Sequence, residues 1–151
     1  MKSIVTIAAA GMLVVGLAEP AAAFRFSPAR THFVAAGPAS ATLNGVTLNC
    51  RGKFRLVVNK VGKGKITAVS FSGGTGCSTV GVAGLPWAIT ATSASTATIT
   101  NADFTSKGGP CGPANMAMTV SGGVIAYNAA FDQCSQVSLS LTTTPTLSIV
   151  P

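Results

Sequence analysis

Acidic side chains are scarce in this 151-residue chain, which has three Asp and Glu residues in total and a single His. Charged residues of both signs make up 9% of the sequence, whereas a typical soluble domain has about 25%. Most acid–base enzymes are hard to build from so few carboxylates and imidazoles, because general acid–base catalysis depends on those groups. Ser, Thr, Asn and Gly must instead cover the surface. The hydrophobic content of 48% argues against intrinsic disorder.

A single long apolar run, residues 4–17, excludes a polytopic membrane protein. Lys2 precedes this run, and Ala21, Ala22 and Ala23 follow it as a small-residue cleavage site, which is the pattern of a secretory signal peptide. The run is also shorter than the roughly 20 apolar residues that a membrane-spanning helix needs. We therefore expect residues 1–23 to be a signal peptide and residues 24–151 to be a single secreted β domain. The expected location is extracellular or at the outer cell surface, reached by export through the periplasm, and an uncleaved anchor is the alternative.

All four cysteines follow the expected cleavage site: Cys50, Cys77, Cys111 and Cys134. An even number of cysteines in an exported chain indicates two disulfides. Three pairings are possible, and we favour Cys50–Cys77 with Cys111–Cys134 because each joins neighbours in the sequence. A zinc site needs close pairs such as C-x-x-C, and the chain has none, so the sequence predicts neither a metal nor a cofactor.

After residue 23, short runs rich in Val, Ile, Thr and Phe alternate with Gly, Pro, Asn and Ser, which is typical of an all-β domain. Apolar and polar residues alternate along several runs, and a period of two places one set on a buried face. The expected strands are residues 31–35, 41–43, 46–50, 53–59, 65–72, 87–92, 96–101, 116–121, 124–128, 136–141 and 146–150. We predict a two-sheet sandwich, Greek-key or immunoglobulin-like, with two disulfides. A β-solenoid is the alternative, although no fixed repeat is present.

Between the strands, tight turns are expected at residues 61–64, 93–95 and 121–123. Residues 73–86 and 106–114 are expected to form long, rigid loops that each contain one cysteine. The runs 24–26 and 147–150 are predicted to be edge strands, through which subunits could self-associate.

The search for catalytic groups finds one possible carboxylate pair, Asp103 and Asp132. Both occur in sequence contexts typical of turns, where capping is the ordinary role of Asp. A G-x-S-x-G nucleophile motif is absent, and His32 lies in an expected edge strand, facing solvent. We therefore predict no catalytic residues and no enzymatic activity.

Positive charge is concentrated in one segment. The chain has ten Lys and Arg residues, of which Lys2 lies in the signal peptide, and six of the other nine fall within 15 positions without an acid between them. These six are a candidate polyanion-binding patch: Arg51, Lys53, Arg55, Lys60, Lys63 and Lys65. The alternative is a solvated hairpin whose charges protect a strand edge from aggregation. On the exposed face no aromatic residue interleaves with the cations, so specific nucleic-acid recognition is not expected.

Several segments together resemble the small secreted activators of alkane oxidation (Pra-type) of Gram-negative bacteria, over the whole mature chain. They are Phe-Ser-Pro at 26–28, residues 33–38, Leu-Asn-Cys at 48–50, residues 64–73, Gly-Leu-Pro-Trp at 84–87, Cys-Gly-Pro at 111–113 and residues 141–145. The Gly-Leu-Pro-Trp segment and the four-cysteine layout are the most specific. The resemblance implies a non-enzymatic protein that promotes growth on alkanes through hydrocarbon contact or dispersion, and related proteins look like cell-surface or biofilm-matrix components.

Two functional hypotheses follow from these observations. The first is a secreted protein that contacts alkane droplets or disperses hydrocarbon at the cell surface. The second is an adhesin or biofilm-matrix subunit that binds polyanions, such as cell-surface polysaccharide, and self-assembles through its edge strands.

Overall fold

The computed structural model describes residues 23–151, which form eleven β-strands and one short 3-10 helix. The expected signal peptide lies outside the described residues except for Ala23. In chain order the elements are β1 (Arg25–Ser27), β2 (Thr31–Leu43), β3 (Val46–Val58), β4 (Gly64–Ser72), η1 (Cys77–Thr79), β5 (Gly81–Val82), β6 (Trp87–Ala91), β7 (Thr96–Ser106), β8 (Gly109–Ser121), β9 (Val124–Phe131), β10 (Cys134–Thr144) and β11 (Ser148–Val150).

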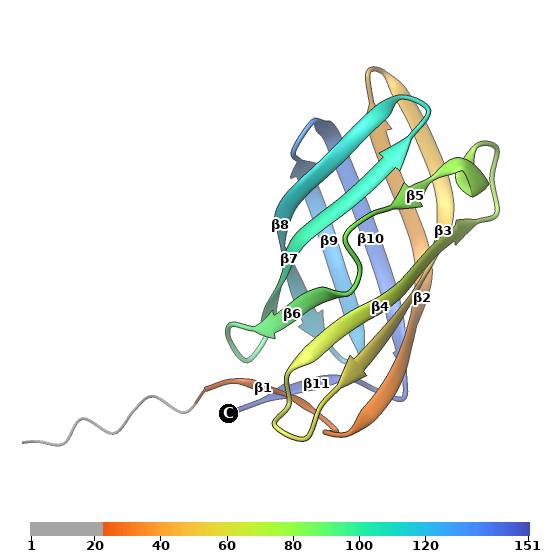
Figure 1. Cartoon of the computed structure of the whole chain (residues 1–151). Coiled ribbons are helices and arrows are strands. Elements are labelled where there is room, and N and C mark those ends of the chain that lie inside the picture. Colours follow the sequence, from red (N-terminus) through yellow and green to blue (C-terminus); the bar gives the residue numbers. More distant parts are fainter. Residues whose placement is uncertain (1–22) are drawn as a thin grey trace, which may run out of the picture.

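Eight of these strands form a closed antiparallel barrel (Figure 1). Strands β2, β3, β4, β6, β7, β8, β9 and β10 pair in chain order, and β10 then pairs with β2 to close the ring. The all-β prediction with two disulfides is confirmed, but the arrangement is a barrel with a small additional sheet rather than the expected two-sheet sandwich or a solenoid. Alternating strands look the same in both architectures, and the pairing of β2 with β10 decides between them.

Gly37 allows the first and last barrel strands to approach one another. A Cβ atom at this position would lie 2.0 Å from the carbonyl oxygen of Ser140, so only glycine fits. Gly37 also pairs with Gly52 of β3. The small residues that suggested breaks after residues 35 and 50 therefore lie inside two continuous strands of 13 residues each, β2 and β3.

The expected loop at residues 106–114 is mostly strand. Lys107 and Gly108 make a two-residue turn, and β8 begins at Gly109. Pro110 and Pro113 are tolerated there because β8 pairs with β9 only near its far end, from Thr119 to Ser121. A proline lacks an N–H, so it suits a strand segment that leaves one edge unbonded.

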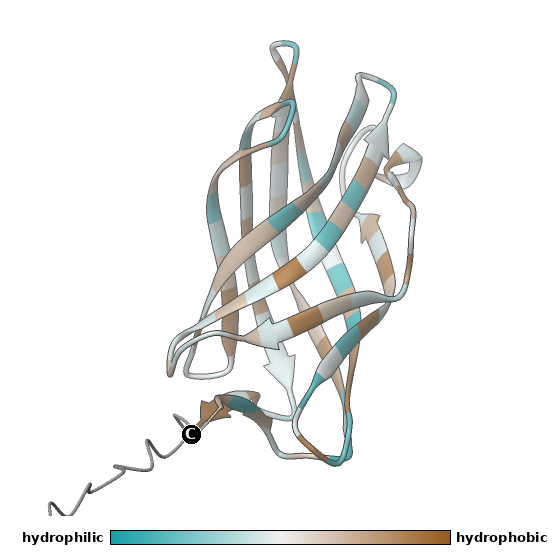
Figure 2. Ribbon diagram, turned by 60° about the vertical axis from the view of Figure 1, so that its left-hand side comes forward, coloured by the Kyte–Doolittle hydropathy of each residue, from teal (hydrophilic) through white to brown (hydrophobic). Residues whose placement is uncertain are grey.

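Apolar and polar residues alternate along the strands, as the colours in Figure 2 show, and the apolar set is buried in the interior of the barrel. Phe104 is the centre of an aromatic group, in edge-on contact with Phe71, Trp87 and Phe131. Large side chains farther down the barrel, such as Leu56 and Ile99, are also fully buried. The lower half of the barrel is therefore a packed core.

One end of the barrel is plugged. Strands β1 and β11 pair with each other and cross this end, which we call the closed end (Figure 1). Phe26 and Leu147 bury their side chains there. The hydroxyl of Thr143 donates to the carbonyl oxygen of Gly123 at 2.7 Å and accepts the N–H of Leu147 at 2.9 Å. The two terminal runs predicted to be edge strands thus pair with one another.

Barrel closure also corrects the expected position of His32. Its strand, β2, is bonded on both sides, to β3 and β10, so it is not an edge strand. The side chain is exposed, as predicted.

Within residues 23–151, the structure contains no helix long and apolar enough to cross a membrane.

Candidate functional site

A cavity of about 380 Å³ opens at the end of the barrel opposite β1 and β11, which we call the open end. Three connections surround its mouth: the β2–β3 turn, the β7–β8 turn and the segment around η1. Its walls come from β2, β3, β7 and β10, and its floor is formed by Phe71 and Phe104. An eight-stranded barrel is just wide enough to hold one small ligand where side chains do not fill it.

The open end is hollow because small residues line it and because two neighbouring strands, β4 and β6, do not pair there. Ala39 and Ala41 of β2 face this space, where the lower half has Phe33. Strands β4 and β6 pair only over Gly64–Ile66, near the closed end, so the barrel widens toward the mouth. The short strand β5 and the 3-10 turn occupy the opening above β6.

The lining of the cavity is mostly apolar. Leu43, Leu48, Val137 and Leu139 lie around the walls with the alanines and aromatic rings. Among the described residues that line the cavity, Lys107 is the one charged side chain, and it is exposed at the rim. Hydroxyl groups of Thr75, Thr79, Thr105 and Ser106 also lie near the mouth. Such a lining favours an apolar chain, with any polar group of the occupant held at the rim.

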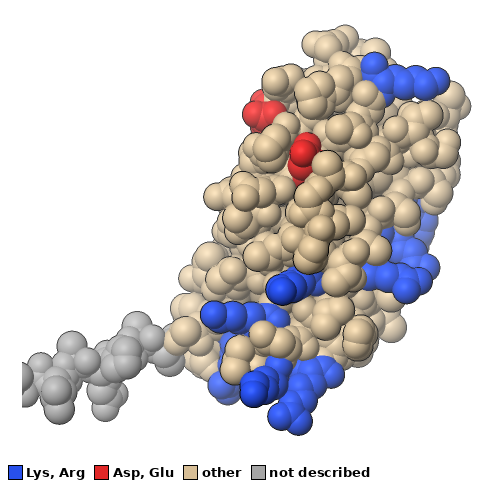
Figure 3. All heavy atoms as spheres, viewed as in Figure 1, with Lys and Arg blue, Asp and Glu red and all other residues tan. Residues whose placement is uncertain are grey.

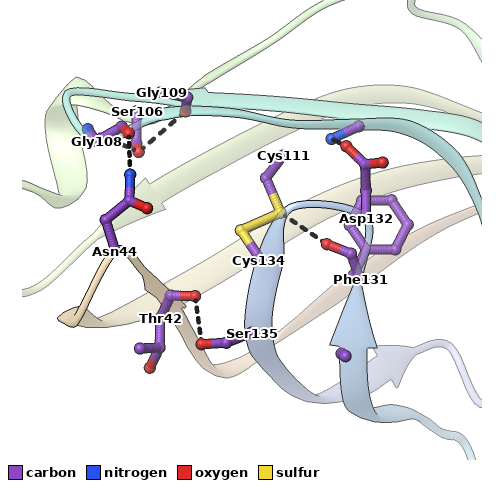
Figure 4. Close-up of a disulfide and its surroundings, with 12 residues drawn as sticks. Thr42, Asn44, Ser106, Gly108, Gly109, Cys111, Phe131, Asp132, Cys134 and Ser135 are labelled. Atoms are coloured by element: carbon purple, nitrogen blue, oxygen red, sulfur yellow. Dashed lines mark hydrogen bonds between the residues drawn. A yellow bond between two sulfur atoms is a disulfide. The ribbon is translucent and has the colours of Figure 1, made fainter.

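Both disulfides are part of the cavity wall. Cys50–Cys77 joins β3 to η1, and Cys111–Cys134 joins β8 to β10 (Figure 4). These are the pairs favoured from the sequence. The second bond spans the region where β8 and β9 do not pair. The disulfides therefore hold together the end of the barrel that has the fewest strand hydrogen bonds.

A hydrogen bond also crosses the mouth. Asn44, in the β2–β3 turn, donates from Nδ2 to the carbonyl oxygen of Gly108 in the β7–β8 turn at 3.2 Å (Figure 4). Nearby, Ser135 donates from Oγ to the carbonyl oxygen of Thr42 at 3.2 Å. The first bond connects turns that are not neighbours in the barrel, and the second joins the paired strands β2 and β10 beside them, so together they fix the shape of the rim.

Comparison with known proteins bears directly on this cavity. The family model of alkane oxidation protein activators, PraA/PraB-like, matches residues 1–151. The chain belongs to this family. No curated protein and no solved structure matches it significantly.

The two acidic residues of the described chain, Asp103 and Asp132, lie apart from the cavity lining. Asp132 is in the β9–β10 turn with a positive φ of 49° and accepts the N–H of Gly112 at 2.9 Å. That contact fits the turn role predicted for it. Asp103 lies within β7, next to a register irregularity, rather than in the expected turn. Within residues 23–151, no group of three or more His, Cys, Asp or Glu residues is placed to bind a metal.

The six predicted polyanion-binding residues lie on the outside of the barrel. Arg51, Lys53 and Arg55 alternate along the exposed face of β3, which we call the β3 ridge. Lys60 and Lys63 follow in the β3–β4 hairpin, and Lys65 is exposed on β4. Figure 3 shows Lys and Arg gathered toward the lower, closed end and the acidic residues near the opposite end.

The fold adds Arg25 and Arg30 to these cations, which the sequence did not predict. The N–H of Arg30 donates to the carbonyl oxygen of Asn59, and a Cβ at Gly62 would lie 2.6 Å from that of Arg25. Eight of the nine Lys and Arg residues in the described chain therefore lie along β3 or at the closed end, with Lys107 the exception.

The cavity was also missed at the sequence level. Its lining has the same alternation as a packed core, and its one distinguishing signal is the run of small residues in β2, Ala-Ala-Gly-Pro-Ala-Ser-Ala.

Proposed function

We propose that this alkane oxidation activator is an exported, non-catalytic protein that holds a hydrocarbon chain in the barrel cavity and so promotes contact between cells and alkane. The observation that carries the proposal is the apolar cavity at the open end. Membership of the activator family supports a role in alkane oxidation, and the signal-peptide pattern supports export.

The size of the cavity favours a chain of medium length. A water-sized group occupies about 30 Å³ in a liquid, so a cavity of about 380 Å³ holds on the order of a dozen methylene-sized groups. Burying ten methylenes contributes about 8 kcal/mol, from which association removes about 4 kcal/mol or more. The net gain of about 4 kcal/mol or less corresponds to a dissociation constant of about 1 mM or weaker. Such reversible binding suits transfer of hydrocarbon rather than storage.

Filling the cavity tests this function. Ala39 is buried and faces the cavity, so Ala39→Phe is expected to weaken binding of decane at least about ten-fold, because the ring takes the volume of several methylenes. Displacement of a fluorescent long-chain probe by decane measures the affinity. Ala88→Phe is the matched control, since Ala88 is exposed on β6 and should leave the affinity unchanged. Equal affinity for all three proteins would contradict the proposal.

The position of Lys107 predicts a preference among chains. A carboxylate at the end of an alkyl chain can pair with the Lys107 ammonium at the rim, whereas an alkane cannot. We expect Lys107→Gln to lower the affinity for decanoate about two- to five-fold, the range of an exposed ion pair. The affinity for decane should not change. Lys53→Gln, on the outside of β3, is the control, and calorimetric titration with both ligands makes the comparison.

A second candidate function, polyanion binding by an adhesin or matrix subunit, is supported by the β3 ridge. Arg51, Lys53 and Arg55 are exposed and follow one another on the same strand face. Acidic polysaccharide at a cell surface is a partner suited to such a row of cations. The barrel is closed, so self-assembly through edge strands would have to use β1, β11, the short β5 or the barrel segments that leave one edge unpaired, such as β8 before Thr119.

A further inference from the structure

The closed end of the barrel combines cations with exposed apolar side chains. Arg25, Arg30, Lys60, Lys63 and Lys65 are all exposed there, and we call them the closed-end cluster. Phe24 and Val61 are 38% and 55% exposed, which makes them two of the three exposed large hydrophobic residues in the described chain. The third, Val46, is at the open end.

The β3–β4 hairpin presents its tip rigidly. The side-chain oxygen of Asn59 accepts the N–H groups of Val61 and Lys63 at 3.0 and 2.9 Å. The N–H of Phe26 donates to the carbonyl oxygen of Gly62 at 2.9 Å, which fixes the N-terminal strand against the tip. Lys60, Val61 and Lys63 therefore project together and need little further ordering to meet a surface.

From this placement we propose that the closed end docks on a membrane surface rich in anionic lipid, with the cations against the headgroups and Val61 among them. A soluble polyanion would pair with the cations but would gain nothing from Val61 and Phe24, whereas an interface between water and lipid accommodates both kinds of side chain. The acidic residues of the described chain, Asp103 and Asp132, belong to the upper part of the barrel and do not oppose the approach.

Docking in this direction orients the cavity. The mouth lies at the other end of the barrel from the closed-end cluster, so it would point away from the membrane, toward the medium that holds the hydrocarbon. This consequence rests on the proposed function, whereas docking itself does not.

Flotation with lipid vesicles tests the proposal. Vesicles containing phosphatidylglycerol should bind the protein, and vesicles of phosphatidylcholine alone should not. Each cation near an anionic surface contributes about five-fold in affinity, so Arg30→Gln, Lys60→Gln and Lys63→Gln together should weaken binding on the order of 100-fold. The matched control is Arg51→Gln, Lys53→Gln and Arg55→Gln, which removes the same charge from the β3 ridge. Every variant is prepared in the same form as the wild-type protein, with the expected signal peptide removed, so the apolar run at residues 4–17 does not contribute to vesicle binding.

Two further measurements distinguish binding to a lipid surface from binding to a soluble polyanion. Val61→Ser should weaken vesicle binding several-fold and Val46→Ser should not, although Val46 is the more exposed, at 61%. Equal losses for the two charge triplets, or for the two Val→Ser variants, would overturn the proposal. So would binding to soluble polyphosphate without binding to vesicles. Decane affinity measured on the two charge triplets and on Val61→Ser, none of which lines the cavity, should stay at the wild-type value, so failure of docking is distinguishable from failure of the cavity function.

Discussion

Replacing all four cysteines with alanine is expected to lower the free energy of unfolding by about 7 kcal/mol. The two disulfides close loops with sequence separations of 27 and 23 residues. In the chain-entropy account, loops of this size contribute about 3.5 kcal/mol each. A single domain has a total stability of about 5–15 kcal/mol, so the loss amounts to about half of that stability or more. Urea unfolding followed by far-UV circular dichroism measures the change.

The two disulfides should differ in their effect on the cavity. Cys111→Ala with Cys134→Ala releases β8 from β10 where β8 and β9 do not pair, so this pair should weaken decane binding as well as stability. Cys50→Ala with Cys77→Ala frees the segment around η1 that borders the mouth. Ser78→Ala, exposed in the same turn, is the control for the substitution itself. A wild-type midpoint and wild-type affinity in both paired variants would show that strand pairing alone holds the open end.

The sequence predicts the individual strands of this protein better than it predicts their closure into a barrel. Alternation in runs such as Phe54, Leu56 and Val58 identifies strands because burial on one face has a period of two. The disulfide pairs follow from an even count and from proximity along the chain. The pairing of β2 with β10 joins residues about a hundred positions apart, and nothing local in either strand specifies it. A sandwich and a barrel therefore remained equally compatible with the strand pattern.

The sequence predicts the two candidate functional regions to different degrees, because only residues that are close in sequence leave a local pattern. The β3 ridge and its hairpin could be identified because those cations are contiguous in sequence. Arg25 and Arg30 join them only through the crossing of the N-terminal strand beneath the barrel. The cavity depends on which residues face one another across the ring, and Ala39 opposite Phe104 leaves a space that hydropathy alone does not reveal.

Phe104→Ala is the single substitution expected to have the largest effect, because Phe104 belongs both to the packed core and to the cavity floor. Its ring makes edge-on contacts with Phe71, Trp87 and Phe131 at centroid distances of 6.0, 5.2 and 5.9 Å. Removing a buried phenyl ring costs about 3–5 kcal/mol, since the neighbouring rings cannot close the space. Chemical unfolding should show this loss. Phe24→Ala, which removes an exposed ring, should stay within about 0.5 kcal/mol of wild type.

The conservative variant Phe104→Leu separates the two roles of this residue. Leucine keeps the floor apolar and costs less stability, but it deepens the cavity. We therefore expect the chain length that binds most tightly to increase, when octane, decane and dodecane are compared on the folded variant. The same preference as in the wild-type protein, together with the expected loss of stability, would mean that Phe104 supports the core without setting the depth of the site. A shift toward longer chains would instead make the aromatic floor the element that determines which hydrocarbons this activator holds.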